Sequence, residues 1–338
     1  MEKNFLQPLK EAEKKNGTIV LKNNNHRIMQ QIHGIIETNA MYLSEYNEIA
    51  GLFAHGCLIE HNCISNCHFA FDKNNGLKLT VRAAKDIKIG EHISTTYSNV
   101  LWGTQLRRQQ LNEMKYFDCN CERCSDPTEL GTNFSTLRCL GSEEMPCNGL
   151  QMPSNPLSDV SDWACNKCPI KVTNEQVQHL TNQMGGEIDH IISKTPSVSS
   201  IENLIEKLST FLHPNHYHMF GLKHSLIQLY GNHKDSNIKN LTNDILQKKI
   251  QYCDELFGIV NILDPFNIRL SIYTAIILYE KSTTIAELKK RKLGQYTSEV
   301  ALQCLQQAKN ILKKELDSLQ GRLLNEKIDK TIEYFNLY

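Results

Sequence analysis

The chain lacks the long apolar segments that export or membrane insertion would require. Its first ten residues contain no apolar core of the kind found in secretory signals. No apolar run approaches the ~18 residues of a membrane span, and the most apolar stretch, 268–279, is interrupted by Arg269. We therefore expect a soluble, intracellular protein with no membrane association.

An excess of charge of either sign is also missing. Lysine plus arginine and aspartate plus glutamate number 37 each, and the isoelectric point is about 7.2. Binding to a nucleic acid needs a basic surface, so the composition does not support a direct nucleic-acid partner. The basic run 289–292 falls in a helical pattern and is interpreted as a solvated helix face rather than a nuclear signal. The compartment is left open between cytoplasm and nucleus.

The periodicity of apolar residues divides the chain into zones that suit two or three domains. Residues 77–82 alternate apolar and polar side chains, which predicts a half-buried strand. Residues 86–90 predict a turn, and 92–97 a short strand after it. Residues 127–172 are rich in Cys, Pro, Gly and Ser and show little periodicity, whereas the pattern from about 175 onward is helical.

The helical zone predicts a series of consecutive helices. Residues 201–212 place apolar side chains at i, i+3, i+4, i+7 and i+11, which is one apolar stripe. Ser200 is the candidate N-cap of this helix, and Pro214 is expected to end it or to open the next one. Helices of this length in sequence favour helical hairpins stacked as an array. The further predicted helices cover 215–230, 238–258, 266–281, 296–318 and 321–336.

The twelve cysteines predict metal sites, because a chain without a secretory signal rarely forms disulfides. Residues 119–124 read Cys-Asn-Cys-Glu-Arg-Cys and supply three thiolates within six residues. Tetrahedral zinc needs four ligands, so a partner must come from elsewhere in the chain. Cys63 is the first candidate, and Cys57 and Cys67 are alternatives on spacing alone.

A second group of four cysteines resembles the layout of a zinc ribbon, with two pairs separated by a loop. Its first pair is more widely spaced than usual, and the alternative interpretation is a cysteine-rich loop with Trp163 packed over it. The predicted ligands of this second structural zinc are Cys139, Cys147, Cys165 and Cys168.

Other cysteines and histidines are interpreted as structural. Cys253 and Cys304 lie in helical patterns and are expected to be small core residues. Residues 213–218 contain a His-x2-His-x-His pattern that looks metal-like, but it spans the helix break at Pro214, and no carboxylate or cysteine completes a ligand set. Helix-end packing or capping is the favoured role for these histidines.

Three motifs, in the correct order, resemble the SET and MYND domain-containing (SMYD) family, in particular its arthropod-type branch. The family's N-H-S-C-x-P-N appears as Glu-His-Asn-Cys-Ile-Ser-Asn at 60–66, and its G-E-E-x-x-x-x-Y as Gly-Glu-His-Ile-Ser-Thr-Thr-Tyr at 90–97. Its aromatic residue followed by C-x-C-x-x-C appears at 117–124. Residues 51–124 resemble the C-terminal half of a SET domain with its post-SET zinc motif, and the resemblance extends over nearly the whole chain.

The resemblance implies a protein-lysine methyltransferase that uses S-adenosylmethionine and acts on a lysine-containing protein, either a histone or another protein. Tyr97 is the implied catalytic residue, with its hydroxyl in the channel where the lysine amine meets the methyl group. The implied cofactor-binding residues are Glu60, His61, Asn62, Tyr97 and Phe117. The implied ligands of the first zinc are Cys63, Cys119, Cys121 and Cys124, which makes about two zinc ions for the chain.

The chain departs from the family pattern at residues expected to lie near the cofactor. Glu60 replaces an asparagine, so this position can accept but not donate hydrogen bonds. Ser65 replaces a proline at a turn. Lys115 stands where many relatives carry a second channel tyrosine, and its positive charge would oppose the cofactor's sulfonium.

The family's MYND finger and its Gly-x-Gly cofactor loop have no counterpart upstream of Cys57, so we expect a shortened form of a longer protein. The alternative function is therefore a catalytically impaired zinc protein or transcriptional regulator, whose helical domain serves as a peptide-docking scaffold. The expected fold is α+β. Its predicted parts are a helical insert of the SET domain at 1–50, the C-terminal SET β-structure at 51–118, a post-SET zinc segment at 119–172 and an all-helical TPR-like domain at 173–338.

Overall fold

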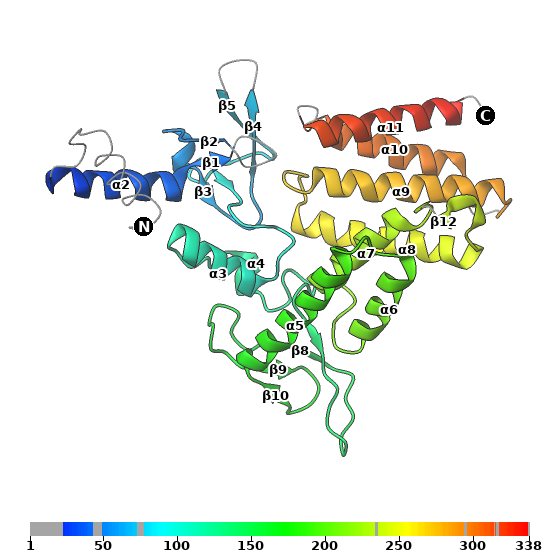
Figure 1. Ribbon diagram of the computed structural model, residues 1–338, viewed down its shortest axis with the longest axis horizontal. Helices are drawn as coiled ribbons and strands as arrows, with labels where there is room; N and C mark the ends of the chain where they lie inside the picture. Colours follow the sequence, from blue (N-terminus) through cyan, green and yellow to red (C-terminus); the bar gives the residue numbers. More distant parts are fainter. Residues whose placement is uncertain are drawn as a thin grey trace, which may run out of the picture.

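The chain is α+β, with short strands in its first half and a helical array in its second half (Figure 1). Of the predicted helical insert, 1–22 and 43–48 lie outside the described residues. This computed structural model describes residues 23–42, 49–72, 78–233, 236–293, 296–313, 315 and 318–336.

The N-terminal region consists of one long helix and small two-stranded ladders. Strands β4 and β5 form the longest ladder, an antiparallel pair that confirms the alternation predicted near residue 80. Strands β3 and β6 pair in parallel, although about thirty residues separate them in the sequence. The elements are α2 (Asn23–Asn39), β1 (Met41–Tyr42), β2 (Ala50–Gly51), the 3-10 helix η2 (Gly56–Leu58), β3 (Glu60–His61), β4 (Cys67–Asp72), β5 (Lys78–Ala83), β6 (Ser94–Thr95), α3 (Thr104–Lys115) and α4 (Glu122–Ser125).

The cysteine-rich segment folds as a four-stranded antiparallel sheet in the order β10-β9-β8-β7. Strands of two to four residues offer too few alternations to be recognised from the sequence, so periodicity gives no sign of this sheet. Its strands are β7 (Leu137–Arg138), β8 (Leu150–Pro153), β9 (Trp163–Cys165) and β10 (Lys171–Val172).

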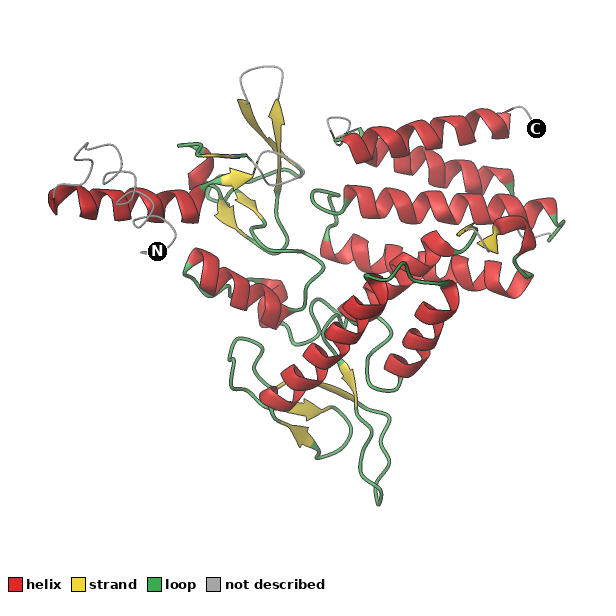
Figure 2. Cartoon of the chain, viewed as in Figure 1, coloured by secondary structure: helices red, strands yellow, loops and turns green. Residues whose placement is uncertain are grey.

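The second half of the chain is the predicted helical array, in which successive helices pack side by side (Figure 2). Each predicted helix exists, and the last four begin or end several residues from the predicted bounds, as expected where capping decides the ends. The elements are α5 (Asn174–Ile192), α6 (Val198–Ser209), α7 (Tyr217–Leu229), β11 (Asn232–His233), β12 (Ser236–Asn237), the 3-10 helix η3 (Ile238–Asn240), α8 (Asn243–Leu263), α9 (Ser271–Lys290), α10 (Ser298–Leu312) and α11 (Leu319–Asn336).

The predicted N-cap of α6 is wrong by one helical turn. Ser197, not Ser200, is the cap, and its hydroxyl oxygen accepts the backbone N–H of Ser200 at 3.1 Å. An N-cap side chain accepts a hydrogen bond from the backbone N–H three residues later. The helix therefore begins directly after Ser197, before the apolar stripe starts. The histidine prediction is confirmed at His216, which caps α7 by accepting the backbone N–H of His218 at 3.2 Å.

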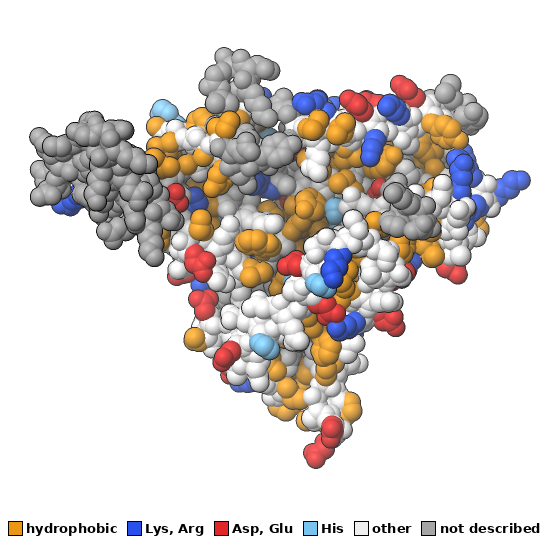
Figure 3. All heavy atoms as spheres, viewed as in Figure 1, with side chains coloured by type: hydrophobic (Ala, Val, Ile, Leu, Met, Phe, Trp, Pro, Cys, Tyr) orange, Lys and Arg blue, Asp and Glu red, His pale blue; other side chains and the backbone are white. Residues whose placement is uncertain are grey.

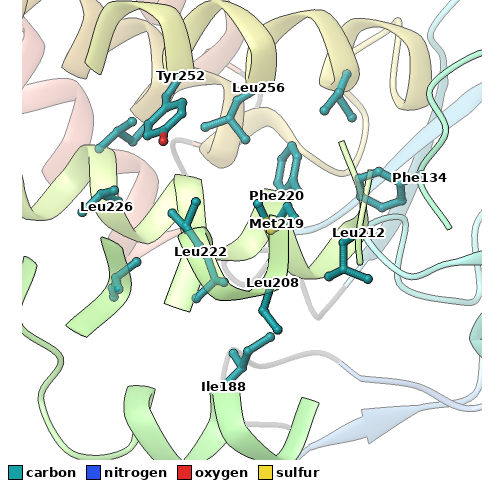
Figure 4. Packing of buried hydrophobic residues seen from close by; sticks show 14 of the residues in the cluster. Phe134, Ile188, Leu208, Leu212, Met219, Phe220, Leu222, Leu226, Tyr252 and Leu256 are labelled. Carbon is teal, nitrogen blue, oxygen red and sulfur yellow. The ribbon is translucent and has the colours of Figure 1, made fainter. Parts of the chain in front are cut away.

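One continuous apolar core joins the cysteine-rich segment to the helical array. Helices α6, α7 and α8 contribute most of its side chains, and the predicted stripe of α6 is buried in it (Figure 4). Phe134 and Trp163, from the segment before the array, belong to the same core. Cys253 and Cys304 are buried in helices, as predicted. Burial of these large side chains, at roughly 1.5–3 kcal/mol each, fixes the array against the cysteine-rich segment and its sheet β7–β10.

The helices and one face of the surface show how apolar and charged side chains are distributed. In the part of the chain that the structure describes, no helix is both long and apolar enough to cross a membrane. Acidic and basic side chains are both scattered over the face shown in Figure 3.

Helix α7 buries a histidine without a compensating charge. His224 is 8% exposed and packs between the rings of Phe220 and Tyr273. Burial lowers the pKa of His224 to about 4, only partly offset by a backbone hydrogen bond involving Tyr273. In the unfolded state, His224 is protonated near its ordinary pKa of ~6.5. In the folded state, it is protonated only near pH 4.

We therefore expect stability to fall as pH decreases from about 6.5 toward 4. The contribution of His224 to the loss between pH 7 and pH 5 should be about 2 kcal/mol. In urea titrations at pH 7 and pH 5, the free energy of unfolding of His224→Phe should fall by about 2 kcal/mol less than that of the parent chain. His179→Phe, which replaces an exposed histidine on α5, should lose as much as the parent. Equal losses for all three proteins would contradict the assignment.

Candidate functional site

The first cysteine group closes around one point, as the sequence predicts. The ligand sulfurs of Cys63 and the 119–124 triplet all lie within 4.8 Å of one another, and Cys63 Sγ is 3.6 Å from Cys124 Sγ. Tetrahedral zinc with Zn–S bonds of ~2.3 Å needs sulfurs about 3.8 Å apart, whereas a disulfide needs about 2.05 Å. The alternatives Cys57 and Cys67 lie outside this cluster, in η2 and β4. The donor set fits zinc.

The second group is equally compact. Cys139 Sγ lies 3.6 Å from Cys168 Sγ, and Cys147 Sγ lies 3.7 Å from Cys165 Sγ. Two turns direct backbone N–H groups at these sulfurs, from Gly149 to Cys147 at 3.2 Å and from residue 167 to Cys165 at 3.3 Å.

Gly149 cannot be replaced at the first of these turns without a shift. A Cβ there would stand 2.5 Å from Cys165 Sγ. The turn is therefore shaped to bring the two cysteine pairs together, as a four-thiolate zinc site requires.

Two arginines and one glutamate lie next to the first cluster, and no sequence pattern predicts their position there. Arg107 donates through Nε to Cys63 Sγ at 3.4 Å and through Nη2 to Cys124 Sγ at 3.5 Å. Its Nη1 donates to Glu129 Oε2 at 2.7 Å, and Arg123 Nε donates to the same oxygen at 3.0 Å. All three charged side chains are almost completely buried.

Glu129 offsets one of the two positive charges in this triad. Burial alone would raise the pKa of Glu129, but the two guanidinium groups outweigh it and hold that pKa below its ordinary value. For Arg107, burial works in the opposite direction, and Glu129 together with the thiols Cys63 and Cys124 raises its pKa well above the ordinary value. Arg107 therefore stays cationic and offsets negative charge on the thiolates.

The parallel pair β3–β6 brings two of the sequence motifs together. Glu60 lies opposite Ser94, and His61 opposite Thr95. Asn66 locks this crossing, because its Nδ2 donates to the carbonyl of His92 at 2.8 Å and its Oδ1 accepts the N–H of Ser94 at 2.8 Å. Asn66 lies in a motif that the sequence singled out, but its locking role was not predicted.

His61 lies at the centre of the predicted cofactor residues. Its Nδ1 accepts the backbone N–H of Tyr97 at 2.9 Å, which leaves the proton on Nε2, 3.4 Å from Cys63 Sγ. Its ring centroid lies 5.3 Å from that of Tyr97 and 5.8 Å from that of Phe117. One imidazole therefore connects the thiolate cluster to both predicted aromatic residues.

A cavity of about 460 Å³ opens beside His61. Three carboxylates line it, from Glu60, Glu91 and Glu122. Phe266, from the loop between α8 and α9, lines it from the helical array. The remaining lining residues are Asn62, Ile64, Ser65, Asn66, Lys85, His92 and Ser94.

Two departures from the family motifs contact each other at this cavity. Glu60 Oε2 lies 2.7 Å from His92 Nδ1, and each of these residues replaces another type in its motif. Lys85 pairs with Glu91 at 2.5 Å. Tyr97 and Phe117 do not line this cavity, although both pack near His61.

The Tyr97 hydroxyl donates a hydrogen bond to the carbonyl oxygen of Ile59. Burial, and then the negative charge of Glu60, raises the pKa of Tyr97, so the hydroxyl keeps its proton at neutral pH. Lys115 approaches the other side of this residue, with Nζ 5.6 Å from the centroid of the Tyr97 ring.

Comparison with known proteins agrees with the motifs. The SET domain family model matches residues 5–98. The chain is 37% identical over 143 residues to the SET domain-containing protein SmydA-8, isoform A, of Drosophila melanogaster, and is 37% identical over 82 residues to the histone-lysine N-methyltransferase SMYD3 of Homo sapiens. The SET domain match and these similarities support a place in the SMYD family.

The matches cover part of each protein. The first covers 41% of the chain and 30% of the Drosophila relative, and the second covers 24% of the chain and 18% of the human relative. The mouse histone-lysine N-methyltransferase Smyd1 is 30% identical over 110 residues, which are 28% of the chain and 22% of that protein. The chain therefore spans about a third or less of the length of these relatives.

We expect the chain to carry about two zinc ions, one for each four-thiolate cluster. Metal analysis of the purified chain should lose about one zinc in Cys63→Ala and none in Cys67→Ala. Equal zinc content in both variants would contradict Cys63 as a ligand.

Removing the charge of Glu129 should be far more costly than removing an exposed carboxylate. Glu129→Gln removes the one carboxylate shared by two buried guanidinium groups, at a cost of about 3–5 kcal/mol in the free energy of unfolding. The control is Glu187→Gln, which breaks an exposed bridge to Lys207 of 2.7 Å and should cost about 1 kcal/mol or less. Denaturant titration measures both, and similar costs would contradict the role of the triad.

Proposed function

We propose that the chain is a SMYD-type protein-lysine methyltransferase that uses S-adenosylmethionine, with a histone or another lysine-containing protein as substrate. The arrangement around His61 supports this most, because it connects the thiolate cluster, the acidic cavity and Tyr97. A cytoplasmic or nuclear location belongs to the same proposal, since the free thiolates of the zinc clusters need a reducing compartment.

The cavity beside His61 is the proposed cofactor site, and its residues fit that group. Glu60, His61 and Asn62 line it, and Phe117 packs against His61. When bound there, S-adenosylmethionine would supply a methyl group on a positively charged sulfonium. The carboxylates of Glu60, Glu91 and Glu122 favour a cationic ligand at this place.

Tyr97 is the proposed catalytic residue because its hydroxyl is positioned and protonated. The bond to the Ile59 carbonyl uses its proton and leaves the oxygen lone pairs to accept from an incoming amine. A lysine must reach this point uncharged, although its ordinary pKa is ~10.4. A tyrosine hydroxyl that accepts one N–H would orient the amine, which is a positioning effect.

The zinc clusters have a positioning role in this proposal. Cys63 follows His61 by two residues, and Cys119 follows Phe117 by two. A metal that joins the two cysteines therefore holds His61 and Phe117 against each other. The second cluster would stiffen the sheet that carries Trp163 into the shared core.

A second candidate function is a zinc protein without methyltransferase activity that binds peptides through its helical array. Lys115 favours this alternative, since a positive charge beside Tyr97 opposes a sulfonium. Cofactor binding separates the two functions. Calorimetric titration with S-adenosylhomocysteine should give saturable heat for an enzyme and none for a binding module.

The acidic cavity predicts a charge-selective loss of affinity. Because the substrate cofactor carries a sulfonium and the product does not, Glu60→Gln should weaken S-adenosylmethionine binding about tenfold and S-adenosylhomocysteine binding much less. Glu113→Gln, an exposed change on α3 outside the cavity, should alter neither affinity. Titration calorimetry gives all values, and an equal loss for both ligands would contradict this placement of the cofactor.

A further inference from the structure

The loop between α8 and α9, residues 264–270, brings the helical array to the acidic cavity. Asp264, which is 5% exposed, fixes the shape of this loop. Its two carboxylate oxygens accept the backbone N–H groups of residues 268–270 at 2.7 to 2.9 Å. Asn267 turns the chain with a left-handed φ of 49°. A loop held by three bonds to one buried carboxylate has little freedom, and Phe266 lies within it.

Strand β4 holds this loop against the N-terminal region. The guanidinium of Arg269 lies over the ring of Phe69, 5.5 Å from its centroid. The neighbouring strand residue contributes a second contact, since His68 Nε2 lies 4.0 Å from Oε1 of Glu315, which follows α10. The strand begins directly after residues 64–66, which line the cavity. One strand therefore connects the cavity wall to the helical array.

Phe266 gives the cavity an aromatic wall. Of the described residues that line the cavity, Phe266 is the one with a benzene ring, and it is partly buried. Phe117, which the family pattern implies for the cofactor, packs on His61 and does not line the cavity. The other lining side chains are mostly polar or charged, so they suit the charged end of a ligand better than a flat ring.

We propose that Phe266 is a specificity-determining residue whose ring packs against the adenine base of the cofactor, so that the helical array completes the proposed cofactor site. This inference rests on the proposed function. An aromatic side chain and a nucleobase stack favourably because each has a flat π face, and this contact does not depend on the charge elsewhere in the ligand. The carboxylates of the cavity respond to the sulfonium, whereas Phe266 recognises the base.

The base is common to S-adenosylmethionine and S-adenosylhomocysteine, so the two ligands separate this contact from an effect of charge. Loss of the Phe266 ring should weaken the binding of both ligands equally, unlike the charge-selective loss expected for Glu60→Gln. The contact also predicts that ligand binding holds the loop 264–270 more firmly, because the base lies between that loop and the N-terminal wall of the cavity.

Titration calorimetry of the purified chain with each of the two ligands tests the proposal. Phe266→Ala should weaken the binding of both by about tenfold, and Phe266→Tyr, which keeps the ring, should stay within about twofold of the parent. The matched control is Phe335→Ala, a partly buried phenylalanine of α11 outside the cavity, which should alter neither affinity. A loss confined to S-adenosylmethionine would overturn the proposal.

Hydrogen exchange of the parent chain decides the outcome if the variants fail to fold. Saturation with S-adenosylhomocysteine should slow exchange in peptides that cover 264–270 as well as in those that cover 60–66. Slower exchange at 60–66 alone, or equal affinity of Phe266→Ala and the parent, would overturn the inference and leave the methyltransferase function standing. No heat when S-adenosylhomocysteine is added to the parent chain would overturn both.

Discussion

The connection between Cys63 and the 119–124 triplet is the constraint on which the rest of this structure depends. It joins two segments that carry different parts of the site, and Arg107 makes it electrostatically tolerable by donating to two of its sulfurs. Glu129 and Arg123 complete a buried set of charges in which one carboxylate pairs with both guanidinium groups. Because an isolated buried charge costs several kcal/mol, the members of this set hold one another in place.

Polar contacts and buried aromatic residues also connect the cysteine-rich segment to the helical array. Asn174, at the start of α5, accepts the indole N–H of Trp163 at 3.1 Å and also a bond from Gln105 of α3. Trp163 and Phe134 then enter the core formed by the helices. Arg269 stacks over Phe69 of β4, 5.5 Å from its ring centroid. The array is therefore packed against the N-terminal region through cores and polar contacts at several places, and its orientation to the proposed site is set by packing.

The neighbours of Glu60 and Lys115, two positions that differ from the family pattern, indicate how each charge is accommodated. Glu60 gives a negative charge to a cavity proposed for a cationic ligand, and it contacts His92, which also differs from the family motif. Among the residues that the structure describes, no carboxylate forms an ion pair with Lys115; its amine donates to a carbonyl of α2 and lies over the face of Tyr97. A charge accommodated by dipoles and an aromatic face is less strongly held in its ionised form than one with a carboxylate partner.

Local spacing was enough to predict the 119–124 triplet, the second cysteine set and the helices, because ligand spacing and 3.6-residue periodicity are properties of neighbouring residues. The motif residues 60–66 and 90–97, and Cys63 as the fourth ligand, were implied by the family resemblance; spacing alone left Cys57 and Cys67 as alternatives. The small sheet β7–β10 and the triad of Arg107, Arg123 and Glu129 needed the tertiary structure. So did the direction of Lys115, which depends on where α2 and Tyr97 lie. The sequence alone determined which chemical groups the chain has and their local geometry. Only folding decided which of them meet, because contacts between distant residues depend on packing and on the burial of charge, which no local pattern encodes.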